Sequence, residues 1–438
     1  MAVGDINGDG KDDLFFGSSK FVPSQVFLQK DTLFAKEKYN TISNASIKED
    51  IVAVIADFNN DEQNDFFIGS AGAQFSGKAK ALKDSYYVKK DSGFVKLALP
   101  EYFENATVVR PYDYDGDGDL DVFVGGHTIT GTFGKAAKSY MLKNDKGKFT
   151  IAQEFNLGML TDAVWSDFNA DGVKDLVVIG EWMAPIFLKV QNDKLQEDET
   201  LASDITGLWQ AIQAFDIDGD GDQDYLLGNW GLNSKFTATK KAPLKLFYGD
   251  FDENGQTETI LALPKNGKYY TLAGFDDLSS QLIFLRKKFN AYKDFAGLEI
   301  EKVFGKEVLA KATVLNVTTL ASGYLENNEG KFTFKPFKEE LQVSPLTAFL
   351  THDFDGDNKK EVLLGGNYFG VKPYHGRFDS FSGAMIKNEN EVILGNTLGL
   401  DFANRSLRHL NIVTFNDKDY LLATFNNEKV QVYEIETR

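Results

Sequence analysis

The chain has 438 residues, of which 42% are hydrophobic and 13% aromatic, so it can build one large domain or two or three ordinary ones. Its formal net charge of −18 argues against nucleic acid as a partner, and the absence of cysteine excludes disulfide bonds and thiol chemistry. No run of about 18 apolar residues is present, so the sequence predicts no direct insertion into a membrane.

The chain starts with Met1-Ala-Val-Gly and reaches an acidic loop at Asp5 without a preceding secretory signal. Later copies of this loop follow longer apolar segments, such as residues 51–56. The first strand is therefore expected to be cut short. We expect the chain to be a fragment of a longer protein.

An acidic nine-residue pattern occurs seven times along the chain. It has the form Asp-x-Asp/Asn-x-Asp/Asn-x-x-x-Asp/Glu and starts at Asp5, Asp57, Asp113, Asp167, Asp216, Asp250 and Asp353. Calcium takes oxygen ligands at about 2.3–2.6 Å, and a tight loop supplies them from alternate side chains and one carbonyl. An EF-hand ends its ligand set later and lies between helices, whereas here apolar residues and a glycine follow at once, as in 122–125. Each loop is therefore predicted to bind calcium and to join two strands.

The predicted ligands are the side chains at loop positions 1, 3, 5 and 9 and the backbone carbonyl at position 7. In chain order the sets are Asp5, Asn7, Asp9, Lys11 and Asp13; Asp57, Asn59, Asp61, Gln63 and Asp65; Asp113, Asp115, Asp117, Asp119 and Asp121; Asp167, Asn169, Asp171, Val173 and Asp175; Asp216, Asp218, Asp220, Asp222 and Asp224; Asp250, Asp252, Asn254, Gln256 and Glu258; and Asp353, Asp355, Asp357, Lys359 and Glu361. Glu62 replaces the small turn residue of the other copies, so its loop is expected to be strained. A single copy is also compatible with an acidic turn without metal, although calcium is favoured, and seven copies favour up to seven calcium ions strongly.

The acidity of the chain is concentrated in these loops. They hold 24 of the 65 acidic residues at ligand positions, which leaves 41 against 47 Lys and Arg elsewhere. The rest of the chain is therefore slightly basic, and the negative charge lies where bound cations would neutralise it.

The segments around the loops predict four short strands per repeat. One apolar segment enters the loop, a second leaves it toward a glycine such as Gly69, and two more follow, as in 85–88 and 93–96. The first five loops start 52, 56, 54 and 49 residues apart. Four-stranded units of this period are typical of β-propeller blades. We therefore predict an all-β fold, and we expect the terminal strands to close one blade together, which would remove exposed sheet edges.

The loop at Asp250 departs from this regular spacing. It begins only 34 residues after Asp216, and a helix-like apolar pattern follows within residues 276–297. The simplest interpretation is one propeller domain over residues 1–438, in which residues 240–317 form a partly helical insertion within one blade. Residues 406–436 predict three strands without a calcium loop, which gives seven blades. Eight blades would follow if the Asp250 segment were a blade of its own.

The tandem acidic loops, each followed by apolar residues and in most copies a glycine, resemble the FG-GAP/VCBS repeats of integrin-α-type propellers. The Asp250 segment, residues 320–334 and residues 374–379 are similar to large bacterial VCBS-repeat proteins related to cartilage acidic protein. This resemblance covers essentially the whole chain. It implies a calcium-binding propeller that is exported or attached to the cell surface, and it implies little about the ligand.

The same resemblance implies that the calcium loops lie on one face and that the loops after each second strand lie on the opposite face. Aromatic and polar side chains gather on that opposite face, with Glu181 beside Trp182, and they suit a flat glycan or a protein hot spot. The candidate ligand-binding residues are His127, Trp182, Asn229, Trp230, Asn367, Tyr368, Tyr374, His375 and Arg377. The alternative is that the tryptophans only pack between adjacent blades and bind no ligand.

Few features of the sequence suit catalysis. There is no Gly-x-Ser-x-Gly or His-Glu-x-x-His motif, and histidine occurs only at positions 127, 352, 375 and 409. We expect a calcium-stabilised binding or adhesion module, not an enzyme, that is extracellular or at the outer cell surface and recognises a glycan or a protein. Two alternatives stay open: a polysaccharide-cleaving propeller using His127 or His375 with Tyr374 and Arg377, and a purely structural segment. The oligomeric state is not defined by the sequence.

Overall fold

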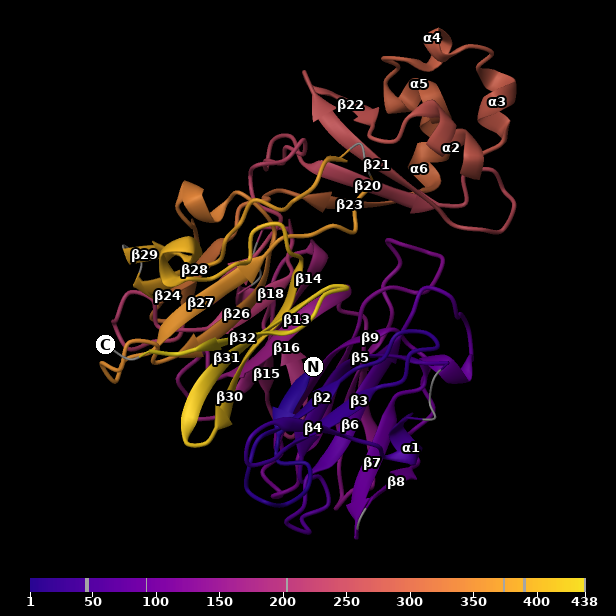
Figure 1. Ribbon diagram of the computed structural model, residues 1–438. Helices are drawn as coiled ribbons and strands as arrows, with labels where there is room; N and C mark the ends of the chain where they lie inside the picture. The colour runs from indigo at the N-terminus through magenta and orange to yellow at the C-terminus, as the bar shows by residue number, and fades with distance from the viewer. Residues whose placement is uncertain (44–46, 92, 202–203, 373–374, 389–390, 437–438) are drawn as a thin grey trace.

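The computed structural model describes residues 1–43, 47–91, 93–201, 204–372, 375–388 and 391–436 (Figure 1). Within these ranges the chain is all-β, as the repeat pattern predicts: eight small antiparallel sheets hold the strands, and the helices are few and short. None of the helices in the described part of the chain is long and apolar enough to cross a membrane.

Sheets 1 to 3 follow one another in the N-terminal part of the chain, and each pairs its four strands in sequence order. Sheet 1 contains β1 (Ala2–Gly4), β2 (Asp13–Phe16), β3 (Gln25–Gln29) and β4 (Phe34–Glu37); sheet 2 contains β5 (Glu49–Ala56), β6 (Asp65–Ala71), β7 (Ser85–Lys90) and β8 (Gly93–Leu97); and sheet 3 contains β9 (Ala106–Tyr112), β10 (Asp121–Gly126), β11 (Ser139–Lys143) and β12 (Thr150–Phe155).

Sheets 4 to 7 continue this order, with two departures. Sheet 5 pairs β19 with β24, although almost a hundred residues separate them, and sheet 7 has only three strands. Sheet 4 contains β13 (Met159–Ser166), β14 (Asp175–Met183), β15 (Ile186–Val190) and β16 (Leu195–Glu197), with β17 (Gly207–Leu208) added to β14; sheet 5 contains β18 (Ala211–Ala214), β19 (Tyr225–Gly228), β24 (Gly323–Asn328) and β25 (Lys331–Pro336); sheet 6 contains β26 (Leu346–His352), β27 (Glu361–Gly366), β28 (Ala384–Asn388) and β29 (Glu391–Leu394); and sheet 7 contains β30 (Leu407–Phe415), β31 (Lys418–Phe425) and β32 (Gln431–Glu434).

The chain between β19 and β24 forms a separate unit, which we call the outer unit. It holds the eighth sheet, in the order β22-β21-β20-β23, and five short helices that lie together on one side of the molecule (Figure 1). Its elements are β20 (Leu244–Gly249), β21 (Glu258–Lys265), β22 (Lys268–Thr271), α2 (Phe275–Gln281), α3 (Phe284–Lys288), α4 (Tyr292–Phe295), α5 (Ile300–Phe304), α6 (Lys306–Lys311) and β23 (Thr313–Val317). One further short helix, α1 (Asn40–Ser43), follows sheet 1.

The first strands of sheets 1 to 7 contact one another in a fixed order. Strand β1 contacts β5, β5 contacts β9, and the series continues through β13, β18, β26 and β30. Strand β30 in turn contacts β1. The outer unit does not interrupt this series, because β18 contacts β26 directly and the outer unit reaches the other sheets through β23 and β14.

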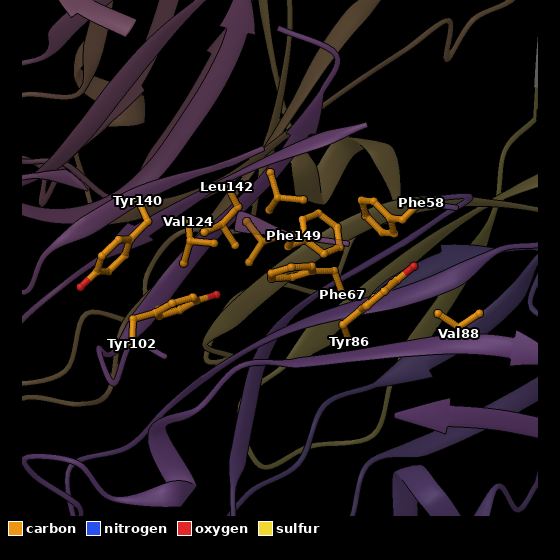
Figure 2. Close-up of a cluster of buried hydrophobic side chains, with 12 residues drawn as sticks. Phe58, Phe67, Tyr86, Val88, Tyr102, Val124, Tyr140, Leu142 and Phe149 are labelled. Carbon is orange, nitrogen blue, oxygen red and sulfur yellow. The ribbon is translucent and has the colours of Figure 1, made fainter. Parts of the chain in front are cut away.

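The hydrophobic core is divided into clusters between successive sheets. Figure 2 shows the cluster between sheets 2 and 3, in which Phe58, Phe67 and Tyr86 surround Phe149. The Phe149 ring lies 5.1 Å from that of Tyr86 in an edge-to-face arrangement, a geometry that aromatic pairs prefer. Burial of each such side chain contributes about 1.5–3 kcal/mol, so these clusters hold neighbouring sheets together.

Threonine hydroxyls also connect successive sheets. Thr107, Thr161 and Thr347 each lie where the register of a first strand shifts. Their hydroxyls donate to the carbonyls of Leu160, Trp209 and Leu407 at 2.7, 2.9 and 3.0 Å. Leu160 and Leu407 belong to the next sheet, and Trp209 lies in the segment that enters the next sheet. A bulge leaves its extra residue outside the ladder of its own sheet, which makes its side chain available for this bridge.

One expectation about the chain ends is wrong. Strand β1 pairs with β2 and β32 pairs with β31, so within the described residues the two termini do not share a sheet. Sheet 7 is built from C-terminal residues alone, and its third strand keeps an exposed Val432.

Candidate metal centres and ligand pocket

The acidic loops connect neighbouring strands, as predicted, and are shaped by their own aspartates. In all seven, the carboxylate at position 1 accepts a hydrogen bond from the backbone N–H at position 6, as from Gly118 to Asp113 at 3.0 Å. The backbone at position 6 is left-handed in every copy. Glycine adopts that conformation without strain, whereas Glu62, with φ 65°, adopts it at a cost, so the structure gives a physical cause for the expected strain.

The carboxylate at position 9 is buried in every copy and links the loop to the rest of the sheet. Asp121, for example, is fully buried and accepts the backbone N–H of Asn144 at 2.7 Å, just after the third strand. Asp13, Asp65, Asp175 and Asp224 make the equivalent bond. Glu258 and Glu361 instead accept N–H groups of their own loops, from Phe251 at 2.9 Å and Phe354 at 2.8 Å.

Four loops bring three carboxylates together closely enough to hold a metal ion. In each of the following groups, one oxygen per residue lies within 4.8 Å of the others: Asp113, Asp115 and Asp121; Asp216, Asp218 and Asp224; Asp250, Asp252 and Glu258; and Asp353, Asp355 and Asp357. The other three loops carry asparagine at position 3, namely Asn7, Asn59 and Asn169, whereas the Asp250 loop carries its asparagine, Asn254, at position 5. Their amide oxygens are also possible ligands.

The electrostatics of these loops favour a cation. Burial raises the pKa of Asp121 to about 7, against the hydrogen bond from Asn144, and the charges of Asp115 and Asp117 raise it further. Buried oxygens of Asp121, Asp222 and Asp252 have no hydrogen-bond partner among the described residues. A hard divalent cation would supply the missing partner for such oxygens, so the donor set fits one.

The predicted ligand residues on the opposite face separate into two groups. Asn229 and Asn367 are fully buried, and both amide groups bond to backbone, for example Asn367 Nδ2 to the carbonyl of Phe381 at 2.8 Å. Arg377 pairs with Asp379 at 3.3 Å and stacks on Phe369. These three side chains hold loops in place. Tyr374 lies outside the described residues.

His127, Trp182, Trp230, Tyr368 and His375 lie close to one another. The Trp230 ring centroid is 5.7 Å from that of Tyr368 and 5.8 Å from that of Phe236, and Phe236 lies 5.3 Å from His375. The Nε2 atom of His127 is 3.4 Å from Glu181, the residue before Trp182. The structure therefore gathers five of the nine predicted residues around one place.

A cavity of about 480 Å³ occupies that place, between the ends of β14 and β19 and the outer unit. It is lined by Phe133, Glu181, Trp182, Leu208, Trp230, Phe236, Leu244, Leu246, Thr259, Leu261, Leu272, Ala273, Asp277, Ser280, Gln281, Gly370, Val371, Lys372 and His375. The sequence did not indicate the part contributed by the outer unit, because Leu244, Leu246 and Leu261 look like ordinary strand residues. Such a volume lies within the usual range of small-ligand pockets.

The polar end of this pocket is Glu181. Its Oε1 accepts a hydrogen bond from Gln210 at 3.0 Å, and its Oε2 faces His127. Burial acts to raise the pKa of Glu181, but the hydrogen bond and the charge of His127, together with the hydrogen bond from Gln210, outweigh burial and lower it below its usual value. Glu181 is therefore ionised at neutral pH inside a mainly apolar pocket.

One family model matches a part of the chain. Residues 167–227 match the model of the FG-GAP-like repeat family, a segment that contains the acidic loops at Asp167 and Asp216. None of the curated proteins matches the chain. Among solved structures, the chain is similar to the V. cholerae biofilm matrix protein Bap1, with 14% identity, coverage of 100% of this chain and 76% of that one, and a TM-score of 0.39, which supports no statement about shared function.

Proposed function

We propose that the chain is a seven-bladed β-propeller, stabilised by calcium, that acts as a binding or adhesion module outside the cell or at its surface. The contact series of the first strands supports the closed ring, since it runs from β1 through seven sheets and returns from β30 to β1. Residues 240–317 are then an insertion within the fifth blade, because β19 pairs with β24 across the segment that contains them.

Calcium is the proposed cation, and the observation that carries this proposal is the repetition of one donor set. Seven loops place carboxylate or amide oxygens at the same positions, and the match to an FG-GAP-like repeat covers two of them. The Asp, Asn and Glu residues at positions 1, 3, 5 and 9 would hold the ion with one carbonyl. When bound, calcium would neutralise carboxylates that otherwise repel one another.

The proposed recognition surface is the face opposite the acidic loops, with Trp182, Trp230 and the pocket beneath the outer unit at its centre. Aromatic rings beside an ionised carboxylate suit a ligand with both apolar and hydrogen-bonding parts, such as a glycan or a protein segment. We propose binding rather than catalysis. Cleavage of polysaccharide is the alternative, and His127 with Glu181 is the pair that would carry it.

The experiment has two arms that use the calcium-loaded chain. Binding to a glycan panel and to a panel of extracellular proteins is compared between the wild type and Trp182→Ala or Trp230→Ala, and release of sugar fragments is measured on the same glycans. Binding that is lost in these variants and intact in a Trp165→Phe control, without fragment release, supports the proposal. If binding is unchanged in both variants, the binding site lies elsewhere on the protein. If sugar fragments are released and the release requires His127, the protein is an enzyme and the binding proposal is wrong.

A further inference from the structure

A β-bulge shapes the inner wall of the pocket. At the end of β14 the pairing shifts, so that Glu181 pairs with Leu208 and Met183 pairs with Gly207, while Trp182 lies between them outside the register. Trp182 has φ 63°, a conformation that a bulky residue adopts only under strain. Strained positions cluster at binding sites, and bulges redirect side chains there. Here the two neighbours Glu181 and Trp182 both line the same cavity.

Glu181 has capacity to accept further hydrogen bonds. An ionised carboxylate offers about four acceptor positions on its two oxygens, and Gln210 and His127 use one on each. The other charged groups at the pocket, Asp277 and Lys372, lie 2.7 Å apart and pair with each other. Burial lowers the pKa of His375, as do Lys235 and Lys372, which keeps that ring uncharged at neutral pH. The chemistry of Glu181 therefore calls for a ligand that donates hydrogen bonds, and most strongly for a cation.

Trp230, in contrast, requires a ligand that accepts a hydrogen bond. Its indole ring packs at 5.2 Å from Phe378 and at similar distances from Tyr368 and Phe236, but its Nε1–H is buried without a hydrogen-bond partner among the described residues. Leaving a buried donor unpaired is unfavourable, because the donor has lost its hydrogen bond to water. A ligand that places an acceptor against this N–H removes that cost.

The remaining walls are mainly apolar, although Thr259, Ser280 and Gln281 of the outer unit also line the pocket. Phe236, Leu244, Leu246 and Leu261 belong to one buried cluster that joins the outer unit to sheets 4 and 5. They offer no hydrogen bond to the many hydroxyl groups of a sugar, whereas they suit an aliphatic or aromatic side chain.

We propose that this pocket binds the amino terminus of a polypeptide whose first residue is apolar. The α-ammonium group donates to Glu181, the carbonyl of the first residue accepts from Trp230 Nε1–H, and the first side chain packs among Phe236, Leu246 and Leu261. Capture of a chain terminus by a charged group and a shaped pocket is a known mode of peptide recognition. This inference rests on the proposed binding role of the face and specifies its ligand as protein.

The test observes the tryptophan indole signals of ¹⁵N-labelled, calcium-loaded protein during titration with the peptide Leu-Ala-Ala-Ala-amide. The signal of Trp230 is expected to shift, because its N–H gains an acceptor. The chemical shift of the Trp165 signal is expected to remain unchanged, since its Nε1–H already donates to the carbonyl of Arg110 at 3.2 Å. The N-acetylated peptide lacks the ammonium group and is expected to bind at least about tenfold more weakly. This comparison uses the wild type and does not depend on the folding of any variant.

Two variants locate the contacts. Glu181→Gln keeps the shape of the side chain and is expected to weaken binding of the free peptide about 10- to 100-fold, while Glu154→Gln, an exposed residue paired with Lys138, is expected to leave binding unchanged. Trp230→Phe keeps the aromatic packing and should weaken binding several-fold. Equal binding of both peptides, or no shift at Trp230, overturns the inference. A shift caused by cellotetraose but not by the peptide also overturns it, yet leaves the proposed binding role of the face intact.

Discussion

The ammonium group of Lys143 lies 3.1 Å from a carboxylate oxygen of Asp117 and also pairs with Asp115. Lys143 is the last residue of β11, and Lys387 at the equivalent strand of sheet 6 pairs with Asp355 in the same way. The hydrogen bonds that Lys143 donates to Asp115 and Asp117 raise the pKa of Lys143. A lysine from the third strand thus partly neutralises the loop that we propose as a calcium site.

Lys143→Met separates this role of the lysine from that of the metal. Without calcium, the variant loses the cation that offsets Asp115 and Asp117, so its melting temperature in excess chelator should fall below that of the wild type. With calcium bound, the ion supplies the positive charge, and the two proteins should melt within about a degree of each other. Lys148→Met, which changes an exposed lysine near the same hairpin, is the control. A loss of equal size in calcium and in chelator would mean that the lysine acts independently of the metal.

Glu62→Gly is expected to stabilise the protein. Glu62 occupies a left-handed position that six other loops fill with glycine or asparagine, and its side chain is exposed. Glycine adopts this conformation freely and keeps the N–H that donates to Asp57 at 2.7 Å, so the free energy of unfolding should rise by about 1 kcal/mol. In the extended β16, Glu197→Gly should have the opposite effect. Thermal unfolding of both variants measures the difference, and a loss of stability in Glu62→Gly would contradict the strain.

The repeats made these loops predictable, because seven copies of one pattern define the position of each ligand and the strands on either side. The pattern also exposed the irregular Glu62. The pocket was less predictable. Trp182 and Trp230 stand out in the sequence, but Gln210 and Leu246 do not. Gln210 bonds to Glu181 because the segment before β18 folds back toward the end of β14, and Leu246 lines the pocket because the outer unit lies against it. Asn229 and Asn367 looked like ligand residues because they follow second strands, and their bonds to backbone became visible only in three dimensions.

Thr161→Val tests the connection between successive sheets. The hydroxyl of Thr161 donates to the carbonyl of Trp209 at 2.9 Å, from sheet 4 to the segment that enters sheet 5. Valine has a similar shape but no donor, so the carbonyl loses one of its two hydrogen bonds and keeps the one from the side-chain amide of Gln210 at 3.2 Å. The free energy of unfolding should therefore fall by about 1 kcal/mol. Thr150→Val, at an exposed position of β12, serves as the matched control. Chemical denaturation in calcium compares the two, and equal stabilities would show that the bridge contributes nothing.

Asp84 lies outside the acidic loops, and its protonation should make the free energy of unfolding depend on pH. Burial raises its pKa to about 7, against the hydrogen bond from Ser70 at 2.7 Å and the charge of Lys48. The folded protein then holds a proton that the unfolded chain releases near its ordinary pKa of 3.8. The contribution of Asp84 to stability is therefore present below pH 4 and is lost as the pH rises toward 7, at about 1.4 kcal/mol per pKa unit.

Asp84→Asn removes this titration. Relative to the wild type, the variant should gain free energy of unfolding between pH 4 and pH 7, and denaturation at several pH values measures the difference. Asp91→Asn, in the turn after β7, is the control. A difference that does not change with pH would show that Asp84 is ionised throughout this range in the folded protein.

The central claim is that calcium holds the fold together, and thermal unfolding with and without the ion tests it most directly. An ion that binds only the folded state adds about 2.7 kcal/mol per site when its free concentration is a hundredfold above its dissociation constant, so several sites together rival the stability of an ordinary domain. We predict that excess chelator lowers the melting temperature sharply, that added calcium restores it, and that magnesium restores it poorly because it demands tighter octahedral geometry. Identical melting curves in calcium and in chelator would contradict the claim and leave the seven loops as acidic turns.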